Sequence, residues 1–190
     1  MTKTTDKIAP KLVSTTPKSG SDAIKVNSNL VLKFDEPVKF GLTGNITISD
    51  SKDIHKIAIT DPQIKISGKT ITINPTTDLN SNSHYSVIID SSAIKDLAGN
   101  KFAGILNTTT LSFNTVDNIA PQLDAITAKN LSAPIAIDKN LVLTFNEAIK
   151  AGAGIIVLSN GNDTRKIAIA DKSQITINGK TPIFHRARIE

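Results

Sequence analysis

The residues best suited to chemistry in this sequence are carboxylates and amides in short breaks between apolar segments. Five of them lie within the first hundred residues of the chain: Asp6, Asp35, Glu36, Asp96 and Asn100. Hard oxygen atoms supplied by several loops are the ligands that Ca²⁺ prefers in proteins. The sequence therefore makes these residues candidate Ca²⁺ ligands, provided that the fold brings their loops together.

A second set of the same kind follows about 110 residues later and consists of Asp117, Asn146 and Glu147. The simpler interpretation of both sets is that Asp and Asn form turns, because their short side chains hydrogen-bond to nearby backbone. The dense Asp-x-Asp-x-Asp-Gly pattern of a dedicated calcium loop is absent from the sequence.

Few residues in the sequence are suited to any other kind of functional site. The chain has no cysteine, which excludes disulfide scaffolds, thiol catalysis and thiolate metal sites. No serine lies in a strand–turn–helix elbow. The three histidines, His55, His84 and His185, are expected at the surface, outside any nucleophile–base arrangement. We therefore expect no enzyme, no catalytic residue and no organic cofactor.

The amino-acid composition excludes some classes of binding partner. The net charge of +5 is spread over both halves, and the chain has no tryptophan and one tyrosine. Nucleic-acid binding is therefore not expected, since it needs a concentrated basic surface and, for single strands, aromatic stacking. No apolar run approaches the ~18 residues of a membrane span, and the polar start shows no signal peptide.

The sequence contains the same segment twice. Asn29–Lys39 returns 111 positions later as Asn140–Lys150, and Asp6–Leu12 returns at the same offset as Asp117–Leu123. A period of this length is typical of a domain, not of a solenoid repeat. The chain is therefore expected to hold tandem copies of one module.

The repeat also sets the expected boundaries. Residues 1–5 form a leader, 6–116 a complete domain, and 117–181 an incomplete second copy. Residues 182–190 do not resemble the equivalent part of the first copy and are expected to form an aberrant tail. Either a truncation or frameshift or a genuine short variant accounts for them.

Apolar and polar residues alternate along most of the chain, as in Leu30, Leu32 and Phe34, which predicts half-buried strands. The first copy is expected to have strands near 11–15, 29–34, 44–48, 54–59, 64–73, 84–89 and 109–115. We expect a bulge at Ser67-Gly68, because a hairpin there would return the chain to the end of the domain where it began. Short strands without helical periodicity predict an all-β fold, an antiparallel β-sandwich.

This topology tells which loops meet. The loop after the second strand and the loop before the seventh both return to the pole where the chain begins, beside Asp6. The five candidate ligands of the first copy are therefore expected to converge there. In the second copy Asp117, Asn146 and Glu147 are expected at the equivalent pole, facing the first copy, where a bound ion would stiffen the junction.

Several motifs occur in a fixed order: Asp-x-x-Ala-Pro, Asn-Leu-Val-Leu-x-Phe-x-Glu, Gly-Asn-Ile-Thr-Ile-Ser-Asp, Ile-Thr-Ile-Asn-Pro-x-x-Asp-Leu, Ala-Ile-Lys-Asp-Leu-Ala-Gly-Asn and Leu-Ser-Phe-Asn-Thr. In this order they resemble bacterial Ig-like domains of the S-layer (SbsA) type. The resemblance covers 6–116 in full and 117–181 in part. It implies tandem Ig-like or fibronectin-like sandwiches, the second truncated, in an extracellular or bacterial cell-surface protein such as an S-layer protein or a large secreted adhesin.

These observations favour a non-enzymatic structural or adhesion spacer whose partners are neighbouring Ig-like repeats. Two alternatives remain: a module that binds a polysaccharide or protein ligand, such as a cell-surface glycan, and an accessory domain of a secreted hydrolase. We also expect the second copy to be the less stable half, since its missing final strands leave strand edges open.

Overall fold

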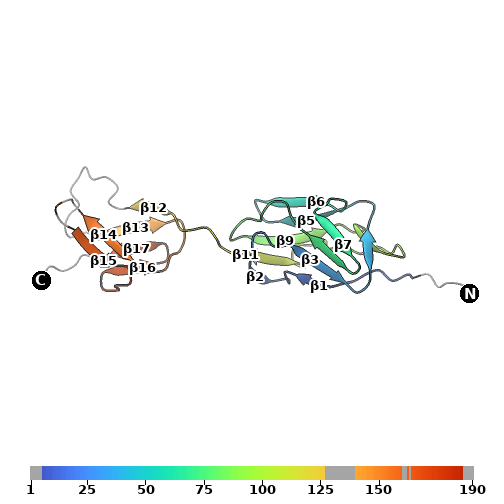
Figure 1. The fold of residues 1–190 in the computed structure, drawn as a ribbon, viewed down its shortest axis with the longest axis horizontal. Coiled ribbons are helices and arrows are strands. Elements are labelled where there is room, and N and C mark those ends of the chain that lie inside the picture. Colours follow the sequence, from blue (N-terminus) through green and yellow to red (C-terminus); the bar gives the residue numbers. More distant parts are fainter. Residues whose placement is uncertain (1–5, 127–139, 160–161, 163, 186–190) are drawn as a thin grey trace, which may run out of the picture. The chain divides into compact units, whose positions relative to one another are not determined.

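The computed structural model describes residues 6–126, 140–159, 162 and 164–185. The chain divides into two compact units, Met1–Asn118 and Ile119–Glu190. Every regular element in the described ranges is a strand (Figure 1), which confirms the all-β fold class. None of the described segments forms a helix that is long and apolar enough to cross a membrane.

The first unit is a sandwich of two main sheets. One sheet has the strand order β1-β3-β8-β7 and the other has the order β2-β11-β9-β5-β6, while β4 and β10 form a separate pair. The strands are β1 (Leu12–Thr16), β2 (Ser21–Ile24), β3 (Leu30–Phe34), β4 (Val38–Phe40), β5 (Asn45–Ser49), β6 (Ile54–Ala58), β7 (Ile64–Ser67), β8 (Thr70–Ile73), β9 (His84–Ile89), β10 (Ile94–Asp96) and β11 (Ser112–Thr115).

The alternating side chains of these strands build one core between the sheets. The residues that the pattern assigned to the core are buried: Leu30, Leu32, Phe34, Ile46, Ile48, Tyr85, Val87, Ile89 and Phe113. The rings of Phe34 and Phe102 meet edge to face, with centroids 5.2 Å apart. Strands from both sheets thus hold a single apolar layer together, as in other β-sandwiches.

The first unit passes its chain from one end of the sandwich to the other. Near the beginning, the backbone carbonyls of Asp6 and Ile8 accept hydrogen bonds from Asn100, in the loop after β10. At the end, Val116 pairs with Asn82 just before β9. Asn82 lies just before one end of β9, and β10 follows its other end. The beginning and the end of the unit therefore lie at opposite poles (Figure 1).

The expected bulge at Ser67-Gly68 is wrong. Ser67 pairs with Thr70, so Gly68 and Lys69 form a two-residue loop between antiparallel β7 and β8. Gly68 has φ of +57°, a conformation that glycine adopts without a side-chain clash. The chain nevertheless leaves at the far pole, so the argument that a hairpin would prevent this was also wrong.

The second unit repeats part of this plan. Its sheets have the orders β12-β13-β17-β16 and β14-β15. Leu123 pairs with Phe145 as Leu12 pairs with Phe34, at an offset of 111 positions. The strands are β12 (Leu123–Ile126), β13 (Leu141–Phe145), β14 (Ile155–Ser159), β15 (Thr164–Ala168), β16 (Ile175–Asn178) and β17 (Thr181–Phe184).

The start of the expected aberrant tail needs correction. Pro182, Ile183 and Phe184 belong to β17, which pairs with β13 and β16 as β8 pairs with β3 and β7. Phe184 is buried with Ile167 and Ile175. The segment has apolar side chains at the positions that face the core, although its sequence differs from that of β8. Residues 186–190 and the leader 1–5 lie outside the described residues.

Candidate metal centre

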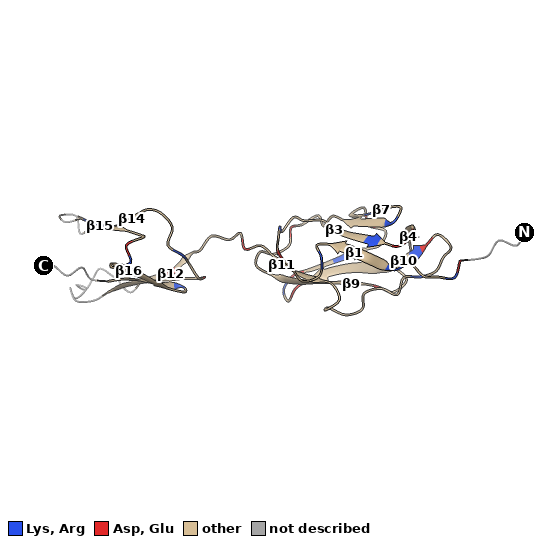
Figure 2. Cartoon of the chain, turned by 90° about the horizontal axis from the view of Figure 1, so that it is seen from below, with Lys and Arg blue, Asp and Glu red and all other residues tan. Residues whose placement is uncertain are grey.

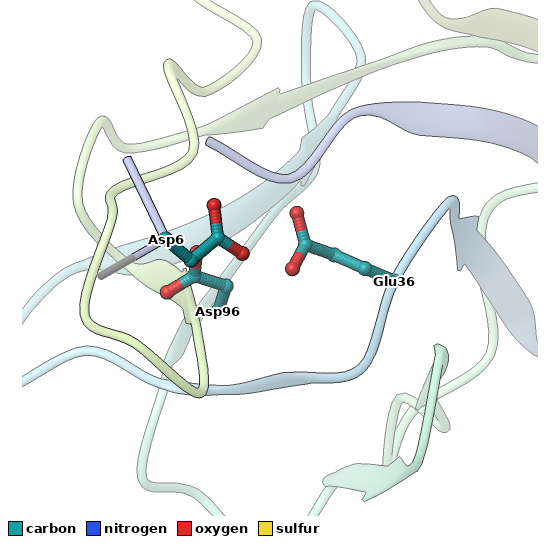
Figure 3. Close-up of side chains that lie close together, drawn as sticks. All are labelled: Asp6, Glu36 and Asp96. Carbon is teal, nitrogen blue, oxygen red and sulfur yellow. The ribbon is translucent and has the colours of Figure 1, made fainter. Parts of the chain in front are cut away.

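Three carboxylates from distant parts of the first unit meet at its amino-terminal pole. Asp96 ends β10, Glu36 lies between β3 and β4, and Asp6 belongs to the segment that leads into β1. One oxygen atom of each lies within 4.8 Å of the others (Figure 3). The structure therefore brings together three of the five residues that the sequence proposed for this pole.

Asp96 is the buried member of this cluster, with no exposed surface. Its Oδ1 accepts hydrogen bonds from the backbone N–H groups of Gly99 (2.5 Å) and Asn100 (2.7 Å). Its Oδ2 accepts one from Asn100 Nδ2 at 2.7 Å. Burial alone would raise the pKa of Asp96, but these hydrogen bonds from Asn100 and Gly99 outweigh it and hold the pKa below its usual value. Asp96 therefore stays ionised inside the fold.

Asn100 holds the carboxylate cluster together through its side-chain amide nitrogen. Its amide Nδ2 donates to the backbone oxygens of Asp6 and Ile8, each at 3.1 Å, in addition to Asp96. The side chain thus ties the leading segment to the β10 loop, and it presents a donor to the carboxylates. Asn100 therefore places Asp6 beside Asp96 through its amide nitrogen, and its role as an oxygen ligand stays a prediction.

Asp35 also serves the strands more than the cluster. Its Oδ1 accepts a hydrogen bond from Lys11 N at 2.8 Å, and its own N–H donates to Lys11 O at 3.0 Å. The ammonium group of Lys69 donates to Asp35 O at 2.6 Å. Asp35 therefore joins the start of β1 to the end of β3, as a turn-forming residue would.

Glu36 is the carboxylate of this cluster whose pKa is raised. Desolvation raises its pKa, and the negative charges of Asp96, Asp6 and Asp35 raise it further, while Lys69 opposes them. A proton or a cation at this position would relieve the repulsion. The cluster therefore offers what a hard cation needs: carboxylate oxygens that converge, with those of Asp96 fixed by buried hydrogen bonds.

The second unit repeats the strand junction, but its described residues contain no equivalent carboxylate cluster. Gln122 N donates to Asn146 Oδ1 at 2.7 Å and Lys180 Nζ donates to Asn146 O at 2.6 Å, as Lys11 and Lys69 do to Asp35. Glu147 Oε1 is buried and has no hydrogen-bond partner among the described residues. Asp117 belongs to the first unit, where its carboxylate accepts from Asn82 Nδ2 at 3.3 Å. The shared site of Asp117, Asn146 and Glu147 remains a prediction.

A polar network in the first unit was missed by the sequence analysis. The Tyr85 hydroxyl donates to Asp53 Oδ2, which also lies 2.6 Å from His55 Nε2. The His55 side chain is 9 % exposed, so its expected surface position is wrong. Asp53 and His55 are two positions apart at the start of a strand, and this spacing, which places both on one face, was the available signal.

The network is structural in form. The Tyr85 oxygen also accepts a hydrogen bond from Asn80 N at 2.8 Å, five residues earlier. This resembles the tyrosine corner of Ig-type sandwiches, in which a tyrosine near the start of a strand bonds back to upstream backbone. The hydroxyl is thus satisfied on both sides and fixes the turn that leads into β9.

The family of the chain follows from its sequence and this geometry together. Residues 6–115 match the family described as bacterial Ig-like domain, and this match spans more than half of the chain. The chain belongs to the bacterial Ig-like domain family. The matched range covers all the strands of the first unit, from β1 to β11.

Solved structures give weaker likenesses to this bacterial Ig-like protein. The S-layer protein rSbsC(31-844) is 21 % identical with a TM-score of 0.36, over 87 % of this chain and 22 % of that one. The N-terminal part of the bacterial S-layer protein SbsC is 17 % identical with a TM-score of 0.36, over 94 % and 44 %. The chain spans less than half the length of either, and no curated protein matches it.

Proposed function

We propose that this chain is a non-enzymatic structural module of a bacterial cell-surface or secreted multi-repeat protein, in which it acts as a spacer between neighbouring Ig-like repeats. The observation that supports it most is the repeated strand junction. The hydrogen bonds around Asp35 recur around Asn146 at an offset of 111 positions. A chain that builds the same domain start twice is suited to a tandem array.

The path of the chain through the first unit supports the same role. Because the unit begins and ends at opposite poles, each added module lengthens an array instead of folding it back. The charge is also suited to a spacer, since basic and acidic residues lie on several separate strands and loops of the described chain (Figure 2). A nucleic-acid partner would instead need basic residues gathered on one face.

The experiment is to join one, two and four copies of residues 6–116 and measure their maximum dimension by small-angle X-ray scattering. A spacer is expected to give a constant increase in length for each added module. A compact particle whose length grows much more slowly would contradict the proposal. A glycan array with the same proteins tests the ligand-binding alternative, and specific glycan binding would favour it.

We further propose that Asp6, Glu36 and Asp96 bind Ca²⁺. The convergence of their oxygens within 4.8 Å supports this function. Asp6 lies on the segment that leads into the unit, so an ion bound there would hold that segment to β10 and stiffen it. The side chain of Asn100 also holds this segment in place, because it donates hydrogen bonds to the backbone oxygens of Asp6 and Ile8.

A further inference from the structure

Strand β5 of the first unit has a hydrogen-bonded strand on each of its two edges. β5 pairs with β6 on one side and with β9 on the other, with Thr47 opposite Ile88 and Ile48 opposite Val87. Val87 N donates away from β5, to Leu111 O at 2.9 Å. Because backbone direction alternates along a strand, the backbone groups of Ile88 face β5.

Strand β14 of the second unit is the counterpart of β5. Ile156 pairs with Ile167 of β15 as Ile46 pairs with Ile57 of β6. Ile169 N donates to Gly154 O at 3.0 Å, so the backbone of Gly154 faces β15. By alternation, the backbone N–H and C=O groups of Ile155 and Val157 face away from β15, toward the side that β9 fills in the first unit.

In the second unit no described strand fills that side. Among the described residues, β14 pairs with β15 alone, and no strand occupies the position of β9. Ile155 is 62 % exposed and Val157 is 55 % exposed. An unpaired strand edge is a template on which another extended segment can add its backbone hydrogen bonds.

The apolar layer beside this edge is also incomplete. In the first unit Ile46 and Ile48 are 0 % and 1 % exposed, because β9 supplies Tyr85, Val87 and Ile89 to the same core. Their counterparts Ile156 and Leu158 remain partly exposed. An apolar cavity in the second unit is lined in part by Leu143, Ile156 and Phe184. Both the backbone edge and the neighbouring side chains therefore lack a cover in the described residues.

We propose that the open edge of β14 is an acceptor site for an extended peptide segment with the alternating apolar pattern of β9, which adds antiparallel to β14. The first unit defines the occupant, since it shows the strand that completes the same pair of strands. Main-chain hydrogen bonds to Ile155 and Val157 would supply affinity, and apolar side chains at alternate positions would cover Ile156 and Leu158. The register places the residue equivalent to Ile88 opposite Val157.

The test uses the full chain and a synthetic peptide of residues 82–91, which contains β9. Hydrogen exchange of the Ile155 and Val157 amides is measured with and without peptide. At a peptide concentration ten times its dissociation constant, exchange at both amides is expected to slow by about tenfold. The Thr47 amide of the first unit is the internal control, since β9 already covers it, and its exchange should not change.

Two N-methylated peptides test the register. A methyl group on the Ile88 nitrogen blocks the bond toward Val157, and protection should disappear. A methyl group on the Val87 nitrogen lies on the opposite edge, and protection should persist. The protein variant Val157→Pro should lose the response, whereas Lys166→Pro, on the outer edge of β15, should keep it.

Three outcomes would overturn the proposal. The first is an absence of protection by the unmodified peptide at millimolar concentration. The second is an equal effect of the two methylated peptides, which would indicate contact without strand addition. The third is protection of Ile155 and Val157 before peptide is added, together with a dimer in sedimentation equilibrium, since this would assign the edge to a second copy of the chain.

Discussion

The Tyr85 hydroxyl donates a 2.5 Å hydrogen bond to Oδ2 of Asp53, thirty-two positions earlier in the chain. The bond joins the start of β9 to the turn before β6, and the same hydroxyl accepts from Asn80 N. Tyr85 therefore connects the centre of the five-stranded sheet to the polar residues at its rim. Both partners lose a hydrogen bond if the hydroxyl is removed.

The substitution Tyr85→Phe is expected to lower the free energy of unfolding by about 1–3 kcal/mol, because it leaves Asp53 and the Asn80 N–H with an unmade bond. Urea unfolding followed by circular dichroism measures this loss. His84→Phe, at the adjacent exposed position of the same strand, is the matched control and should change stability much less. Equal effects of the two variants would contradict a specific role for the hydroxyl.

Tyr85 is also the one tyrosine in the chain, so its ionisation can be followed without interference. Burial raises its pKa well above the usual value, and the hydrogen bond to Asp53 raises it further. The folded pKa exceeds the unfolded one, so this contribution to stability is present below pH about 10 and is lost as pH rises above it. Absorbance at 295 nm should show tyrosinate only as the protein unfolds, and titration near the usual value in the folded state would contradict this.

Phe34→Ala should cost about 3–5 kcal/mol of unfolding free energy, because the ring is buried and packs against Phe102. Phe145→Ala in the second unit is the matched variant, since Phe145 holds the same position in the repeat but remains partly exposed. Its cost should be clearly smaller. Urea unfolding of both variants measures the difference, and equal losses would show that the two cores are equally complete.

Ca²⁺ should raise the melting temperature of the full chain if the proposed site binds it. Binding to the folded state alone contributes about 2.7 kcal/mol at a hundredfold excess over the dissociation constant. Calorimetry with Ca²⁺ and with chelator measures the shift. Glu36→Gln should abolish the part of the shift that the first unit contributes, and Glu147→Gln, at the equivalent position of the second unit, should leave that part in place.

The same variant separates the charge effect from the ion. The pKa of Glu36 is raised, so in chelator the native state loses stability as pH rises through its folded pKa. Glu36→Gln should remove this pH dependence and should not destabilise the chelated protein. If Ca²⁺ leaves the melting temperature of the unaltered chain unchanged at millimolar concentration, the carboxylates serve only as turn formers.

The second unit is expected to exchange its backbone amides faster than the first. Amides of residues 141–145 and 166–169 should be less protected than those of 30–34 and 56–59, since the described strands cover only part of its core. Hydrogen exchange with mass spectrometry compares the two sets in one experiment. Equal protection in a monomeric sample would mean that the second unit is a complete small fold.

The alternation of apolar residues predicted the main strands and the core face, because side chains of period 2 can bury only one side of a sheet. It did not predict the short pair of β4 and β10 or the division of 64–73 into β7 and β8. Leu30, Leu32 and Phe34 are buried as the pattern required. The convergence of Asp6, Glu36 and Asp96 also followed from strand direction. These features depend on the order and direction of the strands.

The features that sequence did not give depend on single hydrogen bonds. The residues at Ser67-Gly68 are compatible with either a hairpin or a bulge. The pairing of Ser67 with Thr70 shows that they form a hairpin. The sequence did not show that the amide nitrogen of Asn100 donates to Asp96. His55 was expected at the surface, and the structure shows it in contact with Asp53, which also accepts from the Tyr85 hydroxyl of β9. Such contacts are set by side-chain orientation, which residue type alone does not determine.

The parallel pairing of β2 with β11 has a mechanical consequence. β2 lies near the beginning of the first unit and β11 is its last strand, and the two run in the same direction. Tension applied at Asp6 and at Val116 would pull them in opposite senses along their length. The hydrogen bonds between them would then be loaded together, in shear, instead of opening one after another as at the end of a hairpin. A spacer built from this unit would resist stretching through this strand pair.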